Sequence, residues 1–186
     1  MKPLHYSNGP GFFPEYKIDY HFYLVIHEFF DGASSTREFV NLLENFGKKL
    51  NNRASLTLPQ AGSYAEIRKN LLRFSWSDER RQFLKSYQHP ILLLSRAPMV
   101  IDQFEAKEAQ LFLFTDGMVD PQMYFAVLNE LADEVNLGRD LLSVSSYLGS
   151  TPPEATGFVR RLWDGLQLKP GVFGVGIDLK KVATGK

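Results

Sequence analysis

The sequence predicts a single-domain α/β protein in which helices cover both faces of a mixed, partly parallel sheet. Three observations support this prediction. Amphipathic helical segments alternate with short apolar segments, some apolar segments are hydrophobic on both faces, and no linker or shift in composition divides the chain. A length of 186 residues suits one domain with a sizeable core. We expect an irregular N-terminal arm over residues 1–16 and one α/β domain over residues 17–186.

Turn formers open the chain, and its clearest strand follows them. Residues 1–16 contain three prolines and the dipeptide Asn8-Gly9, a mixture that favours an irregular arm. The next segment is rich in β-branched and aromatic residues, and it is apolar on both faces from Phe22 to Ile26. It therefore predicts a central strand that is buried on both faces.

Helices and further strands alternate after this point. Capping-box pairs, in which each side chain satisfies a free backbone N–H at a helix start, mark three helices: Ser35 with Glu38, Ser63 with Glu66, and Thr151 with Glu154. Apolar spacing predicts two more helices, at residues 77–87 and 121–136, of which the first either continues the preceding helix or is separate from it. Short apolar segments predict strands at residues 54–58, 89–95, 99–104 and 110–115, and a last strand with a basic end at residues 171–182.

Charge and composition narrow the classes of function. Twenty-one basic residues balance twenty-one acidic ones, which argues against nucleic-acid binding because that activity relies on a basic excess. The absence of cysteine excludes disulfide bonds, thiol nucleophiles and cysteine-ligated metals. No apolar run reaches the length of a membrane helix, and the N-terminus lacks the core of a signal peptide. We expect a soluble cytoplasmic protein without membrane contact that, having no net charge, tends to self-associate as an oligomer.

Acidic residues follow two of the predicted strands. Asp31 and Asp116 each precede a glycine shortly after a strand. If the two strands are parallel neighbours, both carboxylates lie at the carboxyl edge of the sheet, where open α/β folds place their ligands. Carboxylate oxygens there would bind Mg²⁺ or Ca²⁺, with Ser35 or Asp120 assisting, or would share a proton as an acid and base pair.

Local structure accounts for the same residues in another way. Asp120 stands before Pro121, which fits the first position of a helix, so its carboxylate can accept from the free N–H groups of the first turn. Asp116 with Gly117 is typical of a tight turn, since glycine accepts a positive φ. The sequence leaves both interpretations open.

The acidic segments resemble the metal-dependent adhesion site of von Willebrand factor A domains. In that family one strand ends in D-x-S-x-S and a later strand ends in T-D-G; the matching segments here are Asp31-Gly32-Ala33-Ser34-Ser35 and Thr115-Asp116-Gly117. Ala33 stands where the family has its first serine ligand, and no intermediate threonine is evident. The resemblance implies a metal ion held by Asp31, Ser35 and Asp116.

The order of the predicted elements over residues 17–136 looks like that of a thioredoxin-like fold. Strand, helix, strand, helix, hairpin and helix follow one another, and Pro90 stands where that fold has a proline before its third strand. The segment Ala33-Ser34-Ser35-Thr36 would replace the redox C-x-x-C. The resemblance implies a binding or scaffold protein that cannot exchange disulfides.

One histidine and three aromatic residues are further candidates for a binding site. His27, near the carboxyl end of the first strand, is the best placed of the four histidines to act as a base or a ligand. No spacing of histidines typical of a zinc site occurs. Because most other aromatic residues fall within the periodic apolar stripes, we expect Phe12, Phe13 and Trp76 to contact a partner.

The sequence therefore predicts a binding or interaction protein that is non-redox, non-catalytic and without a cofactor, and whose partner is another protein or a second copy of the chain. The alternative is a metal-dependent hydrolase or an adhesion-type metal-binding domain that uses Asp31 and Asp116. In the first case the loss of either carboxylate alters stability at most, and in the second case it abolishes cation binding.

Overall fold

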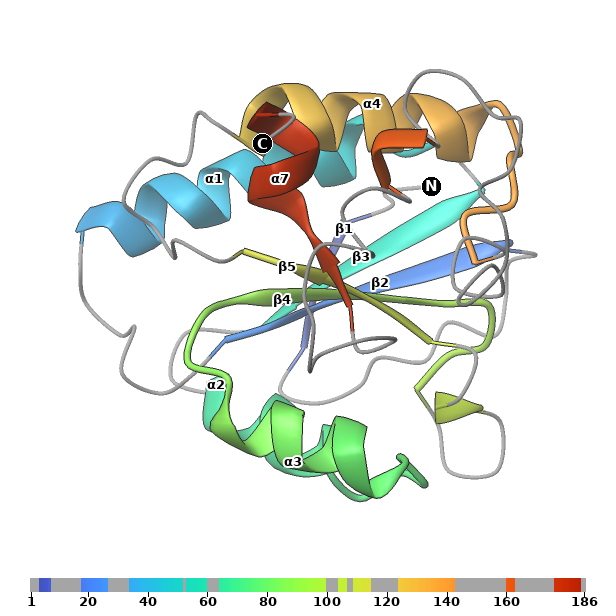
Figure 1. Ribbon diagram of the computed structural model, residues 1–186. Coiled ribbons are helices and arrows are strands. Elements are labelled where there is room, and N and C mark those ends of the chain that lie inside the picture. Colours follow the sequence, from blue (N-terminus) through green and yellow to red (C-terminus); the bar gives the residue numbers. More distant parts are fainter. Residues whose placement is uncertain are drawn as a thin grey trace.

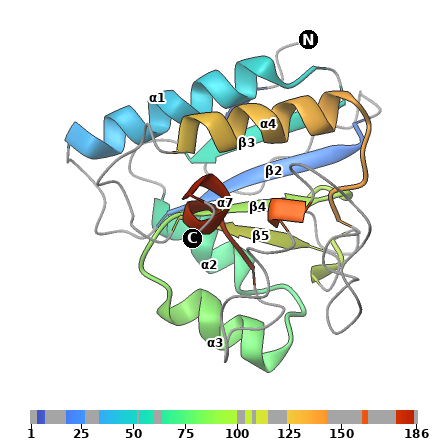
Figure 2. The same cartoon turned by 45° about the horizontal axis from the view of Figure 1, so that its top comes forward.

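One six-stranded sheet lies between two layers of helices in the computed structural model (Figure 1). The structure describes residues 4–7, 18–26, 34–51, 53–59, 64–99, 104–106, 109–114, 124–142, 160–162 and 176–184, with the backbone alone at 4–7, 34–36 and 64–66. Helices α1, α4 and α7 cover one face of the sheet, and α2 and α3 cover the other (Figures 1 and 2). The expected α/β class, with helices on both faces, is confirmed.

The elements follow the alternation that the sequence predicts. The strands are β1 (Leu4–Ser7), β2 (Tyr20–Val25), β3 (Ala54–Pro59), β4 (Ile91–Ser95), β5 (Gln110–Leu113) and β6 (Ile177–Asp178). The helices are α1 (Ser34–Lys49), α2 (Tyr64–Leu71), α3 (Asp78–Ser86), α4 (Phe125–Asn136) and α7 (Leu179–Thr184). Residues 160–162 are also helical, within the helix expected after Thr151.

The sheet is mixed, with the strand order β1-β3-β2-β4-β5-β6. Strands β1, β3 and β2 are mutually parallel, β4 is antiparallel to both β2 and β5, and β6 is parallel to β5. From β2 to α4 this is the order of elements that the thioredoxin-like resemblance implies, with Pro90 directly before β4. Strand β6 extends that arrangement at the β5 edge, and β1 extends it at the β3 edge.

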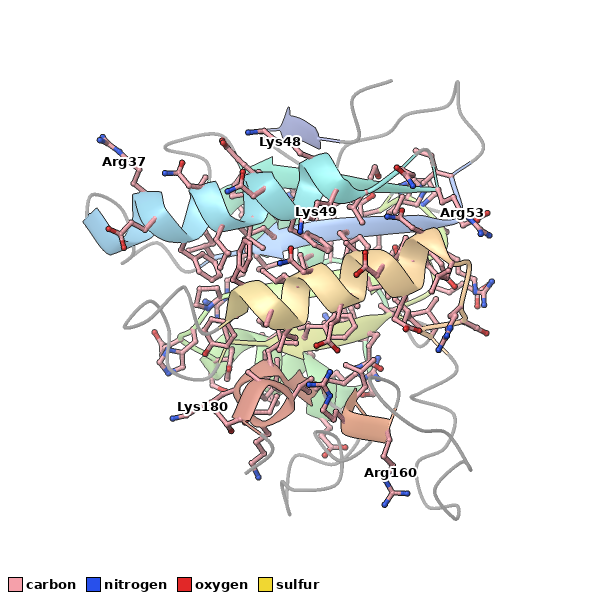
Figure 3. All side chains as sticks on the ribbon, turned by 90° about the horizontal axis from the view of Figure 1, so that it is seen from above. Arg37, Lys48, Lys49, Arg53, Arg160 and Lys180 are labelled. Carbon is pink, nitrogen blue, oxygen red and sulfur yellow. The ribbon has the colours of Figure 1, made fainter. Side chains whose placement is uncertain are left out.

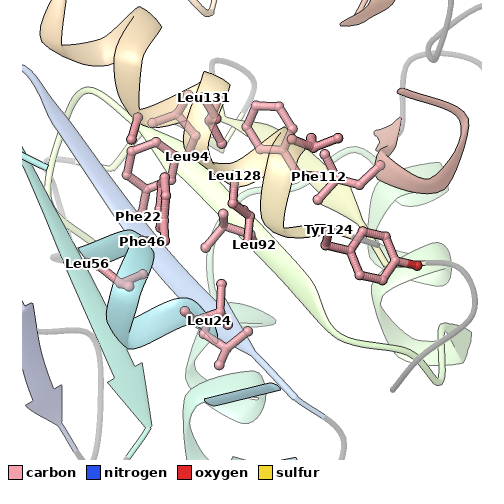
Figure 4. Packing of buried hydrophobic residues seen from close by; sticks show 14 of the residues in the cluster. Phe22, Leu24, Phe46, Leu56, Leu92, Leu94, Phe112, Tyr124, Leu128 and Leu131 are labelled. Carbon is pink, nitrogen blue, oxygen red and sulfur yellow. The ribbon is translucent and has the colours of Figure 1, made fainter. Parts of the chain in front are cut away.

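Side chains of β2 point alternately into two hydrophobic cores. Phe22 and Leu24 belong to the core under α1 and α4, and Tyr23 and Val25 to the core over α2 and α3. Figure 4 shows the first core between the strands and α4, where Phe22 and Phe46 lie close together; their rings meet edge to face with centroids 5.2 Å apart. The prediction of a central strand buried on both faces is confirmed.

The apolar stripe of α1 is also buried as expected. Its members are Phe39, Leu42, Leu43 and Phe46, and Leu50 follows directly after the helix; each is at most 5% exposed. Helices α2 and α3 are separate, because residues 72–77 turn between them and the Ser77 side chain accepts the Arg80 backbone N–H at the start of α3.

Three expectations about element limits are wrong. Residues 4–7 of the supposed irregular arm form β1, which gains regular backbone hydrogen bonds by pairing in parallel with β3. Helix α4 begins at Phe125 and not at residue 121, with Tyr124 at its N-cap, while residues 121–123 lie outside the described part of the chain. In the strand predicted at residues 99–104, Met99 and Phe104 do not belong to a strand, while residues 100–103 lie outside the described part of the chain.

The basic C-terminal segment is a helix where the sequence predicts a strand. Strand β6 ends at Asp178, whose carboxylate accepts the backbone N–H groups of Lys180 at 3.0 Å and Lys181 at 3.4 Å. These are free donors of a first helical turn, so Asp178 caps α7. Leu179 and Val182 then bury the apolar side of the short helix.

Gly176, which precedes β6, lies too close to β5 for any side chain. A Cβ atom there would lie 2.8 Å from the Leu111 carbonyl oxygen and 2.9 Å from the Leu113 Cγ atom. We expect Gly176→Ala to lower the free energy of unfolding by about 1–3 kcal/mol, because the added methyl must push β6 away from a backbone atom. Chemical denaturation measures this loss, and Thr184→Ala at the exposed end of α7 should change stability by less than about 0.5 kcal/mol. Equal stabilities of wild type and Gly176→Ala would contradict the close packing.

Candidate binding site at the carboxyl edge of the sheet

Two parallel strands end at the same level on one edge of the sheet. Val25 of β2 and Leu113 of β5 both pair with Ile91, the first residue of β4. Strands β2 and β5 are therefore parallel, but β4 lies between them, so their ends are about 10 Å apart. The strands that precede Asp31 and Asp116 thus meet the condition of being parallel but not that of being neighbours, because β4 of the β4–β5 hairpin lies between them.

The dipeptide His89-Pro90 enters this carboxyl edge between the two strand ends. Pro90 is buried, and its carbonyl accepts the backbone N–H of Phe114 at 3.2 Å, which fixes the chain where β5 ends. His89 is half-buried, and its Nδ1 atom is buried without a hydrogen-bond partner among the described residues. A polar atom in such a position costs free energy unless a partner satisfies it. His89 thus supplies this edge with a hydrogen-bonding group.

Aromatic rings line both sides of the carboxyl edge. On the α2–α3 side, the Phe83 and Tyr87 rings stack with centroids 4.7 Å apart, and Tyr87 meets His89 edge to face at 5.6 Å. On the α1–α4 side, Phe114 contacts two rings edge to face, that of Phe39 at 4.8 Å and that of Tyr124 at 5.0 Å. Figure 4 shows Tyr124 among the residues of the core under α1 and α4. Phe39, Phe114 and Tyr124 are wholly buried, so they support this edge from within the core. The half-buried Phe83, Tyr87 and His89 are suited to binding an apolar group with a polar anchor.

Most residues singled out from the sequence lie outside the described residues. These are Phe12, Phe13, His27, Asp31, Asp116 and Asp120. Ser35 is the second residue of α1, which begins at Ser34, and its side chain is likewise outside the described part. The roles given to these residues stay predictions.

Trp76 occupies the core between α2, α3 and the sheet. It is 5% exposed, and its indole N–H donates to the Leu71 carbonyl at 2.7 Å. Its ring also meets that of Phe104 at 5.7 Å. This position accounts for the residue by packing at the end of α2 and offers little surface to a partner.

A row of buried polar side chains crosses the sheet on the α2–α3 side. His21 of β2 pairs with Ser55 of β3 and with Ser95 of β4. The His21 Nδ1 atom lies 3.2 Å from the Ser55 hydroxyl, while the Ser95 hydroxyl donates to the Ala97 carbonyl at 2.6 Å. Burial lowers the pKa of His21 to about 4, so the imidazole is neutral at pH 7. With both partners almost wholly buried, this pair is a structural hydrogen bond and not a nucleophile with its base.

Ion pairs lie at the opposite, amino edge of the sheet, where β2 and β3 begin. Arg53 bonds Asp19 at 2.7 Å, and Arg96 bonds Asp140 at 2.7 Å. Tyr20 lies between them, with its hydroxyl donating to the Arg139 carbonyl and the Arg96 guanidinium 5.8 Å from its ring centroid. Figure 3 shows Arg53 at this end of the helix face. Each of these four charges is therefore paired with an opposite charge of the chain.

The described residues offer neither a metal-binding cluster nor a membrane-spanning helix. They contain no group of three histidine or acidic side chains arranged to hold a metal ion. None of their helices combines the length and apolar character needed to cross a membrane.

Comparisons with known proteins leave the chain without an identified relative. No protein-family model matches the sequence, no curated protein is significantly similar to it, and no solved structure matches it significantly. Inferences about function therefore rest on the residues and their geometry.

The sequence analysis favours His27 among the four histidines and does not single out His89. The available signal was its position directly before Pro90 at the start of a predicted strand, since a residue preceding proline is held extended and strand starts lie at a sheet edge. Its place between two parallel strand ends depends on the strand order, which the sequence leaves open.

The buried imidazole of His21 makes stability depend on pH. Its pKa is about 4 in the folded chain and 6.5 when unfolded, so the unfolded state binds the extra proton between these values. The contribution is complete above pH 6.5 and is lost as pH falls to about 4, by about 3 kcal/mol in total. His21→Asn should remove this component, so wild type should lose about that much stability relative to the variant between pH 7 and pH 4 in denaturant titrations. Parallel pH profiles of the two proteins would contradict a buried neutral histidine.

Proposed function

We propose that this protein is a non-redox, non-catalytic binding protein whose binding site is the carboxyl edge of the sheet. The observation that carries this proposal is the half-buried His89, between the ends of β2 and β5, whose Nδ1 atom has no hydrogen-bond partner among the described residues. A chain without cysteine has no thiol to exchange with a disulfide, which removes the redox chemistry possible at such an edge in thioredoxin-like proteins. Binding is the activity that the remaining groups support.

The partner that fits this edge best is a protein, either a different one or a second copy of this chain. Tyr87 and Phe83 are partly exposed and stacked, and rigid aromatic rings of this kind contribute large contact area at low entropic cost. A hydrogen-bonding group from the partner would satisfy the His89 Nδ1 atom. A net charge of zero gives no long-range repulsion between copies.

Replacing His89 tests the location of the site. We expect His89→Glu to weaken binding about tenfold, because a carboxylate desolvated against aromatic rings opposes association. Self-association is measured by sedimentation of the purified protein, and partner binding by capture on the immobilised protein. Lys48→Glu, a change on the exposed surface near the far end of α1, is the matched control and should bind as wild type does. Equal binding by His89→Glu, or neither self-association nor capture by wild type, would refute the proposal.

A metal-dependent function is the second candidate, as a hydrolase or an adhesion-type domain. The observation in its favour is that the strands preceding Asp31 and Asp116 end at the same level and run in the same direction. Side chains that follow such strand ends are the usual source of ligands at this edge of an α/β sheet. The metal would be Mg²⁺ or Ca²⁺ bound through carboxylate oxygens, with Ser35 or Asp120 assisting.

Thermal unfolding of metal-stripped protein distinguishes the two candidates. If Asp31 and Asp116 hold a cation, Mg²⁺, Ca²⁺ or Mn²⁺ at a hundred times its dissociation constant stabilises the native state by about 2.7 kcal/mol. Asp31→Ala and Asp116→Ala should then each abolish the rise in unfolding temperature. Our preferred proposal predicts no rise with any of the three cations, and a rise lost in both variants would overturn it in favour of the metal site.

A further inference from the structure

The helical layer formed by α2 and α3 is more basic than the rest of the chain. Residues 64–90 contain six lysines and arginines against three acidic residues, whereas the whole chain has 21 of each. The remaining residues therefore carry 15 basic and 18 acidic side chains. Both helices lie on the same face of the sheet, so this excess is carried on one side of the molecule (Figure 1).

Two arginines of the layer hold the two helices together, and a third joins α3 to the segment before β5. The Arg68 guanidinium, from α2, donates to the Leu84 and Lys85 carbonyls in the last turn of α3, at 2.5 and 2.7 Å. Arg81, from α3, donates in return to the Leu72 and Phe74 carbonyls just after α2, at 3.1 and 3.2 Å. The third arginine, Arg80 of α3, donates to the Ala106 and Ala109 carbonyls, which lie before β5. Arg68 and Arg81 thus satisfy carbonyls at or just after helix ends, and Arg80 satisfies carbonyls before β5, so the role of all three is structural.

The other three cations of the layer are exposed. They are Lys69, Arg73 and Lys85. None of them takes part in the ion pairs found among the described residues. The described carboxylates of the layer, Asp78 and Glu79, lie in the first turn of α3, where they interact favourably with the positive end of the helix dipole and stabilise the helix.

Partly exposed aromatic and aliphatic side chains lie in the same layer as these cations. Leu72, Phe74 and Phe83 pack against the core with one side and are half-buried. Tyr87 is also half-buried, and its contact with His89 joins this surface to the carboxyl-edge site. The α2–α3 surface thus combines exposed cations, for which the described residues supply no ion-pair partner, with apolar ring edges.

We infer that the α2–α3 surface docks an acidic protein segment that also carries apolar side chains. The inference rests on the proposed binding function and names the chemistry of the partner. Lys69, Arg73 and Lys85 would pair with its carboxylates, and Phe83 and Tyr87 would contact its apolar groups. The balanced charge of the chain disfavours a nucleic acid. Among described residues, the exposed large apolar side chains, Phe125 and Leu137, belong to the opposite layer, which disfavours a membrane surface here.

Reversing the three exposed charges tests this surface. The probe is a short fluorescent peptide of glutamate with interspersed leucine, and binding is followed by fluorescence anisotropy. We expect the triple variant Lys69→Glu, Arg73→Glu, Lys85→Glu to bind at least about tenfold more weakly than wild type, and added salt to weaken wild-type binding. The matched control is Arg37→Glu, Lys48→Glu, Lys180→Glu, which makes the same change of charge on the helix face seen in Figure 3 and should bind as wild type does.

The inference is overturned if wild type does not bind the peptide, if both triple variants lose binding equally, or if a single-stranded oligonucleotide or anionic vesicles bind as tightly as the peptide. Circular dichroism of each variant ensures that folded proteins are compared. If the α2–α3 variant loses binding while His89→Glu does not, this surface stands and the carboxyl-edge site fails; the reverse result rejects this surface alone.

Discussion

Burial of β2 on both faces is the constraint on which the rest of the structure depends. All six of its residues are buried, and it pairs with β3 on one side and β4 on the other. Complete burial of one large apolar side chain contributes about 1.5–3 kcal/mol, so a strand with such residues on both faces requires a helical layer over each. Helices α1 and α4 supply one layer, and α2 and α3 supply the other. His21 is accepted within β2 because it is neutral and lies beside Ser55.

The direction of β2 gives the two edges of the sheet different chemistry. At the amino edge, Arg53 and Arg96 are bound by Asp19 and Asp140, and the chain around Tyr20 is fixed by hydrogen bonds. At the carboxyl edge the described groups are aromatic rings and an imidazole without a hydrogen-bond partner among the described residues. The first arrangement is satisfied within the chain, whereas the second gains from a partner. This difference is the physical basis for placing the proposed binding site at the carboxyl edge.

The α2–α3 layer extends the same reasoning from the edge to a face. Arg68 and Arg81 satisfy carbonyls at the ends of the opposite helices, which holds the pair together by charge-assisted hydrogen bonds. The exposed cations are then presented from the same fixed pair of helices that Tyr87 follows. A partner that reached from the carboxyl edge onto this layer would meet aromatic rings first and positive charge beyond them. One acidic, partly apolar partner would be complementary to both regions.

Local periodicity allowed the sequence by itself to determine the α/β class, the buried strand at Phe22–Ile26 and the stripe of α1, because each pattern is complete within one segment. The sequence did not predict strand β1 or helix α7. Strand β1 is ordered by its pairing with β3, and α7 is ordered by the Asp178 cap and by the burial of Leu179. Of the candidate site, the sequence indicated the carboxyl edge but not His89. Only the tertiary structure put β4 between β2 and β5, and so His89 between their ends, because strand order results from contacts between residues far apart in the chain.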